Sequence, residues 1–554
     1  MNLFDPRLTI RVTFVIASVA AFSTVRLGVA DPREQAGHAW PELDAGDAIV
    51  SRTDDAVFFE LAARPPQGLI KFARLNNVVL HVSASTAPAN TELRLTQDPS
   101  MWSIELPESL SFPTQIRMAV HGTPLLMSVP YVATPSGDGA IVLSACHAIV
   151  HGDKLQFEPQ IYKNTVGYWV DPQAWAEWHF QVKQGGQYVV RVLQGCGAGQ
   201  GGSQVAVVLN DSVGELSRVP FTVQETGHFQ NFVWRDIGKI EMDPGAHRLD
   251  LRVLKLARTA VMDVRQIRLE PVGRVSNEPL AMADVEPDLV PPLLVRAEPR
   301  PGRRVRQTVD GYDSQRVYHA LYLPTDWRED QAYPVIVELT GNGPYRNQQG
   351  DVCEGTVEHA VMGLGITGGY GAIWLTLPFL NDEGVSNVKQ WWGTPPQYRI
   401  EKTLDYWQRA LDETCAGYSG DPRRIVLAGF SRGSLAANRL GLANDQIAAR
   451  WHAFICYSHY DGVVETRPYP EADRAAAVAR LGRLGERAQF ICSEIGTGPT
   501  SLDATQNFLH AVHPTGNFLF HRTGFRNHSD RWLLRPSDCR TELRAWLTEN
   551  TQTD

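Results

Sequence analysis

The sequence predicts two all-β sandwich modules followed by a C-terminal domain in which strands and helices alternate. Residues 48–272 contain short alternating apolar runs separated by Pro, Gly and Asn, as in antiparallel sandwiches. Residues 273–304 are rich in non-periodic proline, which is typical of a semi-rigid linker. From 305 to 550, buried-strand patterns alternate with helical ones, which predicts a mainly parallel sheet covered on both faces.

The N-terminus has the pattern of a signal peptide, residues 1–30. Arg7 and Arg11 precede the apolar run 12–25, and Gly28 and Ala30 are small residues at the cleavage positions. The run is shorter than the ~20 residues that a membrane-spanning helix needs. We therefore expect export to a secreted or periplasmic location, with no membrane span after the signal is removed.

Composition excludes some classes of function. A net charge of −9 over 554 residues gives no polyanion-binding signature, so nucleic acid is not an expected partner. The seven cysteines form no Cys-x-x-Cys pair, so a zinc site built on them is not predicted. We expect neither a metal nor a cofactor.

The first module, 48–143, contains strand-like runs such as 56–61 and 101–106. In pattern it resembles the C-terminal β-sandwich of bacterial α-L-fucosidases. This resemblance brings no catalytic residue with it.

The second module, 144–272, is richer in aromatic residues. Its segments 195–197, 226–230 and 262–265 resemble the galactose-binding-like jelly roll of carbohydrate-binding modules attached to secreted sulfatases and glycosidases. The resemblance implies a sugar-binding face, where aromatic rings stack on a pyranose. The rings available are those of Trp169, Trp175, Trp178 and Trp234. The alternative is that they fill the sandwich core, which is the commoner use of buried aromatics.

The stretch 424–438 contains Gly429-Phe430-Ser431-Arg432-Gly433 between an apolar run and a helical pattern. Glycine two residues on either side of a serine is the pattern of a sharp strand-to-helix turn that exposes a nucleophile. The alternative is an ordinary turn with a capping serine. We predict that Ser431 is a nucleophile and that the backbone N–H of Arg432 binds an oxyanion.

A histidine follows at the position that this arrangement requires. His528 lies just past the last predicted strand, in a loop of Gly, Asn and Ser. There an imidazole can accept the proton of Ser431 and return it to a leaving group.

Three carboxylates remain open as the partner of His528. Glu494 ends the predicted strand before the histidine strand, which makes it the first choice. Asp461 ends the strand before that one, in the unusually polar run 458–461, which is also a candidate pocket wall. Asp503 follows Glu494 in the same connection but is also typical of a helix N-terminus.

A second oxyanion donor is expected after the predicted strand 335–339. Gly341, Asn342 and Gly343 follow that strand, and glycines let the backbone approach an oxyanion closely. The segment departs from the His-Gly opening familiar in lipases. The alternative is a tight turn without a catalytic role.

With this serine, histidine and strand order, residues 305–550 resemble the α/β-hydrolase family, including secreted polyhydroxybutyrate depolymerases and feruloyl esterases. The resemblance implies a serine esterase working through an acyl-enzyme, and the adjoining jelly roll favours an acyl ester on a polysaccharide. A polyester depolymerase or a peptidase of the same fold stays open. A hypothesis of another class is a glycan-binding protein with an inactive hydrolase domain.

Overall fold

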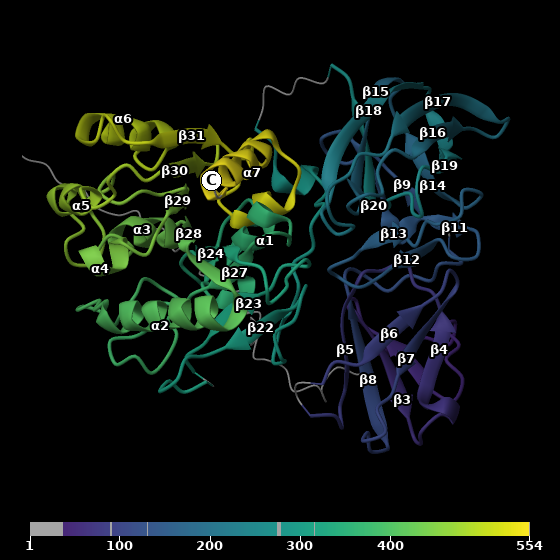
Figure 1. The fold of residues 1–554 in the computed structure, drawn as a ribbon, viewed down its shortest axis with the longest axis horizontal. Coiled ribbons are helices and arrows are strands. Elements are labelled where there is room, and N and C mark those ends of the chain that lie inside the picture. Colours follow the sequence, from purple (N-terminus) through teal and green to yellow (C-terminus); the bar gives the residue numbers. More distant parts are fainter. Residues whose placement is uncertain (1–36, 89–90, 130, 274–278, 315, 553–554) are drawn as a thin grey trace, which may run out of the picture. The chain divides into compact units, whose positions relative to one another are not determined.

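The computed structural model describes residues 37–88, 91–129, 131–273, 279–314 and 316–552. The predicted signal peptide, residues 1–30, lies outside them. Among the described residues, every helix is too short or too polar to cross a membrane. The strands form three sets of sheets along the chain, of which the last is interleaved with helices (Figure 1).

The first module consists of a five-stranded and a three-stranded antiparallel sheet. The first has the order β1 (His38–Ala39), β2 (Ile49–Arg52), β3 (Ala56–Leu61), β8 (Thr114–Val120), β5 (Val79–Ala84), and the second has the order β4 (Leu69–Ala73), β7 (Met101–Glu105), β6 (Arg94–Gln97). Phe59 of β3 lies 5.0 Å from Phe72 of β4 between ring centroids, and Phe72 lies 6.2 Å from Trp102 of β7. All three are buried. The two sheets therefore pack face to face, because alternate strand residues point to one shared core.

The second module has two six-stranded sheets. One has the order β12 (Gln156–Glu158), β13 (Thr165–Gly167), β20 (Asp263–Pro271), β15 (Gly186–Gly195), β18 (Val233–Met242), and β10 (Ile141–Ser144) also pairs with β20. The other has the order β11 (Ile149–His151), β14 (Trp175–Val182), β19 (Gly245–Lys255), β16 (Gln204–Asn210), β17 (Glu215–Thr222), and β9 (Val132–Ala133) also pairs with β14. Val190 and Val192 of β15 share one apolar core with Val205 and Val207 of β16.

The predicted boundary between 143 and 144 cuts through a strand. All four residues of β10 pair with β20, from Ile141 opposite Leu269 to Ser144 opposite Gln266. β9 pairs with β14 of the same module. Residues 132–144 therefore contribute to the second module. Local periodicity does not reveal this, because the partner strands are distant in the sequence.

The α/β domain is built on a nine-stranded sheet. Its order is β21 (Leu294–Val295), β22 (Arg304–Gln307), β23 (His319–Tyr322), β27 (Ile373–Thr376), β24 (Tyr333–Leu339), β28 (Gly420–Phe430), β29 (Ala453–Tyr457), β30 (Gln489–Ser493), β31 (Phe518–Arg522). The six strands from β27 to β31 in this order run parallel. Only the pairings of β23 with β22 and β27 are antiparallel. The mainly parallel sheet agrees with the alternation of strands and helices in the sequence.

The helices cover both faces of this sheet (Figure 1). They are α1 (Met362–Thr367), α2 (Glu401–Tyr418), α3 (Arg432–Arg439), α4 (Asp445–Ala448), α5 (Arg474–Leu481), α6 (Leu502–Val512) and α7 (Asp538–Thr551). Along β24, Val335 and Val337 belong to the apolar core that contains Trp407 of α2. The intervening Ile336 belongs to the core that contains Leu543 of α7. Successive strand residues thus point into two different cores.

Most of the predicted linker 273–304 is part of the α/β domain. β21 lies inside this range, and β22 begins at its last residue. Met282 and Val285 are buried in the core that contains α7. Asp288 forms a buried ion pair with Arg540 of α7. Proline removes backbone donors but leaves the side chains between prolines free to pack, so a proline-rich composition does not reveal this burial.

Candidate active site

Ser431 stands on a strained turn between β28 and α3. Its backbone has φ 54° and ψ −109°, a region that residues other than glycine rarely adopt. A Cβ on Gly429 would lie 2.2 Å from the carbonyl carbon of Gly433, and a Cβ on Gly433 would lie 1.9 Å from the oxygen of Leu339. Because the obstacles are backbone atoms, both positions require glycine. The geometry is that of a nucleophile elbow.

Serine, histidine and glutamate form one chain of contacts. His528, in the loop after β31, has its Nε2 3.2 Å from Ser431 Oγ. Its Nδ1 lies 2.7 Å from Oε1 of Glu494, which directly follows β30. Burial alone would raise the pKa of Glu494, but the hydrogen bond and charge of His528 hold it below its ordinary value. Glu494 is therefore an ionised acceptor that fixes the imidazole with Nε2 toward the serine.

The structure does not bring the other two carboxylates to His528. Asp461 is buried, and its Oδ2 accepts hydrogen bonds from Nη2 and Nε of Arg480, at 2.8 and 3.1 Å. Asp503 is exposed in the first turn of α6 and accepts from Nη2 of Arg522 at 2.7 Å. Each carboxylate is held by an arginine 19 residues away along the chain. These ion pairs form only when the helices dock on the sheet. Strand order alone therefore cannot exclude Asp461 or Asp503 as the partner of His528.

The predicted oxyanion loop lies against the elbow. A Cβ on Gly341 would meet the ring of Phe430 at 2.9 Å, which shows how closely the loop approaches the end of β28. Gly343 donates its N–H to the carbonyl of Lys389 at 2.9 Å and is therefore engaged elsewhere. The backbone N–H groups of Gly341 and Asn342 remain candidates beside that of Arg432.

The side chain of Arg432 supports this loop, a role that its sequence position did not suggest. Its buried guanidinium donates to the carbonyl and hydroxyl oxygens of Thr340, at 3.2 and 2.9 Å. It also donates to the carbonyls of Trp391 and Gly355, at 2.8 and 3.2 Å. Burial lowers its pKa to about 9. One residue thus contributes a helix-start N–H and tethers the opposite wall of the site.

Three further polar residues approach the reacting groups. Buried Asp351 accepts from the backbone N–H of His528 at 2.9 Å and so holds the histidine loop. Ser458 Oγ donates to Glu494 Oε1 at 3.1 Å. Nδ1 of His459 lies 3.3 Å from Ser431 Oγ. The sequence signal for Ser458 and His459 is the polar run 458–461, which directly follows a buried strand. No comparable signal marks Asp351.

Two of the four tryptophans lie in the core of the second module. Trp169 and Trp178 are buried core residues whose indole N–H groups donate to carbonyls of Ala174 and Ser144. Trp234 is half-buried and donates to Asp288 at 2.8 Å. The prediction that these rings bind sugar therefore fails for Trp169 and Trp178. Trp178 points inward from β14, and Trp169, just past β13, packs into the same core.

Trp175 is covered within its own sheet. The His151 ring stacks on it at 3.8 Å between centroids, and the Arg252 guanidinium lies 3.7 Å from its centroid. His151 and Arg252 stand directly opposite Trp175 on the two strands that flank β14, so the indole lies between them. Both ring faces are occupied, which leaves none for a pyranose.

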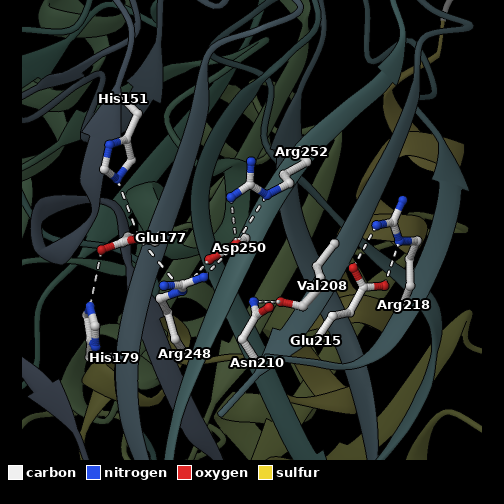
Figure 2. Close-up of polar contacts among 10 residues, drawn as sticks. All are labelled: His151, Glu177, His179, Val208, Asn210, Glu215, Arg218, Arg248, Asp250 and Arg252. Atoms are coloured by element: carbon white, nitrogen blue, oxygen red, sulfur yellow. Dashed lines mark hydrogen bonds and ion pairs between the residues drawn. The ribbon is translucent and has the colours of Figure 1, made fainter. Parts of the chain in front are cut away.

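The neighbouring side chains of this sheet are also paired among themselves (Figure 2). Glu177 lies between His151 and His179, with N–O distances of 3.4 and 3.2 Å. Asp250 accepts from Arg248 and Arg252, at 2.9 Å each. The face is a ladder of polar and charged side chains that pair with one another, mostly across neighbouring strands.

Asp530, two residues after His528, makes folding stability depend on pH. Burial, and next the Glu338 carboxylate, raise the pKa of Asp530 to about 7. In the unfolded chain an aspartate ionises near pH ~4. Between these values the folded state keeps a proton that the unfolded state has lost, so stability falls as the pH rises.

We therefore expect Asp530→Asn to gain stability over the wild type as the pH rises from 4.5 to 8, by at most about 4 kcal/mol. Thermal unfolding of both proteins across this range measures the effect. A difference in Tm that stays constant with pH would contradict it.

Neither a matching family model nor a matching curated protein was found for this chain. Among solved structures, a fungal esterase from Rhizomucor miehei is similar at 12% identity and TM-score 0.34, over 45% of this chain and 84% of that one. An acylaminoacyl peptidase from Pyrococcus horikoshii is similar at 15% identity and TM-score 0.32, over 46% of this chain and 42% of that one.

Two further solved structures are also similar. A family 6 carbohydrate-binding module from Zobellia galactanivorans has 16% identity and TM-score 0.20, over 24% of this chain and 98% of that one. An α-L-fucosidase from a Vibrio strain has 12% identity and TM-score 0.18 over 40% of this chain, which spans only 39% of the fucosidase. Similarity this low assigns no function.

Within the described residues, no group of His, Cys, Asp and Glu side chains is placed to hold a metal ion.

Proposed function

We propose that this protein is a serine hydrolase that cleaves acyl esters, with Ser431 as nucleophile, His528 as general base and acid, and Glu494 as the acid of the triad. One observation carries the proposal. On the elbow, Ser431 Oγ lies 3.2 Å from His528 Nε2, and Nδ1 of the same ring lies 2.7 Å from Glu494. These distances are within the hydrogen-bond reach that nucleophile activation needs.

In the proposed reaction, Ser431 Oγ attacks the ester carbonyl while its proton passes to His528 Nε2. The carbonyl oxygen becomes an oxyanion, for which the N–H groups of Arg432 and of Gly341 or Asn342 are the proposed donors. The tetrahedral intermediate collapses, and the alcohol leaves with the proton from His528. Water, activated by His528, then hydrolyses the acyl-enzyme and restores the serine.

For the substrate we propose an acyl ester on a polysaccharide, such as an acetyl or feruloyl group. The reason is the jelly-roll pattern of the second module, which is typical of chains that act on glycans. Polymeric esters and peptides are the competing substrates of the same mechanism.

A fluorophosphonate probe tests the mechanism. We expect the wild type to be labelled at one site, located by peptide mass mapping to the peptide that contains Ser431, and Ser431→Ala to be unlabelled. Ser501→Ala is the matched control, because Ser501 caps α6 through its side chain and does not contact the triad. An unlabelled wild type, or labelling that persists in Ser431→Ala, would exclude the proposed nucleophile and favour a glycan-binding protein with an inactive hydrolase domain.

A substrate panel then separates the ester classes. Acetylated xylan, feruloylated arabinoxylan, polyhydroxybutyrate and a peptide p-nitroanilide are each incubated with the wild type and with Ser431→Ala. Release of acetate or ferulate by the wild type alone supports the polysaccharide assignment. If the wild type turns over only the polyester or only the anilide, the polysaccharide assignment is wrong and that substrate class takes its place.

A further inference from the structure

A second imidazole approaches the nucleophile from the end of β29. His459 Nδ1 lies 3.3 Å from Ser431 Oγ, and the His459 ring lies 5.3 Å from that of His528 between centroids. The backbone of His459 is tied to α3, because its carbonyl accepts a hydrogen bond from Ser434 Oγ. Oγ of Ser431 therefore contacts two histidine nitrogens.

Counting protons determines the role of each nitrogen. Ionised Glu494 can only accept, so the His528 Nδ1 that faces it carries a proton, and Nε2 of the neutral ring is an acceptor. The single hydrogen of Ser431 must then point to His528 Nε2. No hydrogen remains on Oγ for His459. The contact can be a hydrogen bond only if His459 Nδ1 carries the proton and donates it.

His459 also stays neutral in the folded protein. Burial, followed by the charges of His528 and Arg467, lowers its pKa to about 3. At neutral pH His459 therefore does not compete with His528 for the serine proton and does not titrate with it. A neutral His459 with its proton on Nδ1 places a hydrogen-bond donor 3.3 Å from Ser431 Oγ.

We infer that His459 is a further catalytic residue, which donates Nδ1–H to Ser431 Oγ whenever that oxygen carries developing negative charge. The inference rests on the proposed function of Ser431. Charge develops on Oγ during attack, when the O–H bond breaks toward His528 while the bond to the acyl carbon forms. It develops again in deacylation, when water has added to the acyl carbon, the bond to Oγ breaks, and Oγ recovers a proton from His528 Nε2. The His459 proton stays on its nitrogen throughout.

The variants His459→Leu and His459→Asn test this role with a chromogenic acyl ester. Leu removes the donor, whereas the Asn amide nitrogen can take the place of Nδ1. We expect His459→Leu to lower kcat about 10- to 100-fold, because one hydrogen bond to a charged group is lost. The KM should change much less. Asn is expected to restore kcat to within a few-fold of the wild type. Because charge develops on Oγ in both acylation and deacylation, the pre-steady-state burst and the steady-state rate should both be slower in His459→Leu.

His319 provides a matched control. It is a buried histidine whose pKa, like that of half-buried His459, is lowered to about 3, and its Nδ1 lies 2.9 Å from the hydroxyl of Tyr406. It does not contact the triad. We expect His319→Leu to lower the Tm while the folded fraction keeps the wild-type kcat.

The outcomes distinguish this inference from the proposed function. If the wild type is neither labelled nor active, the proposed function fails. If the wild type is active, a folded His459→Leu with kcat within two-fold of the wild type overturns the role of His459, as does an Asn variant as slow as Leu. Should Leu not fold, Asn is compared with His459→Gln, whose amide nitrogen takes the place of Nε2 instead. Asn must then be at least about 10-fold faster than Gln, and equal rates overturn the inference.

Discussion

Ser431→Ala is expected to lower kcat for a soluble acyl ester by about 10⁴- to 10⁶-fold, and His528→Ala by a similar factor. The two residues act as one unit, because Oγ attacks only as its proton passes to Nε2 across the 3.2 Å contact. The double variant should therefore be no slower than either single variant. Steady-state kinetics on the three variants measures this non-additivity.

Residual activity in these variants is meaningful only in folded protein, so near-UV circular dichroism and Tm must match the wild type. Ser431→Ala deletes one oxygen from a side chain that is already on a strained backbone. We expect its Tm to be unchanged or slightly raised. If the factors for Ser431 and His528 multiply in the double variant, they do not act in one relay.

Glu494→Gln is expected to lower kcat by about 10⁴-fold, as the loss of a triad carboxylate does when geometry is kept. A carboxylate can only accept, whereas an amide can present its NH₂ to Nδ1 and so stabilise the wrong tautomer of His528. The imidazole then turns a protonated Nε2 toward the serine and cannot take its proton. Kinetics of the folded variant tests this result.

The other carboxylates provide the controls for Glu494. Asp503→Asn alters an exposed pair with Arg522 and should leave kcat within two-fold of the wild type. Asp461→Asn leaves buried Arg480 with only the more distant carboxylate of Glu471, at 3.6 Å, so it should lower the free energy of unfolding by about 3 kcal/mol. Its folded fraction should keep its kcat. A larger kcat loss in Asp461→Asn than in Glu494→Gln would assign the acid to Asp461.

The predictions that agree with the geometry of the structure rest on local signals. The segment 429–433 carries the elbow in five consecutive residues, because a Cβ at either glycine would collide with backbone. His528 was found by its position after the last strand. By contrast, the predicted boundary at 143 and the predicted linker 273–304 differ from the structure, because β10 pairs with β20 and Asp288 pairs with Arg540, both far along the chain.

The sequence by itself was enough to predict the class of each segment and to single out Ser431 and His528, because periodicity, turn residues and chain order are local features of the sequence. Tertiary structure decided which acid meets His528. Glu494, Asp461 and Asp503 are all carboxylates close to the ends of late strands, so the sequence does not distinguish them. In the folded chain Asp461 pairs with Arg480 of α5, and Asp503 pairs with Arg522 beside α6, which leaves Glu494 for His528. The same holds for His459, whose contact with Ser431 exists because parallel β28 and β29 end at the same edge of the sheet.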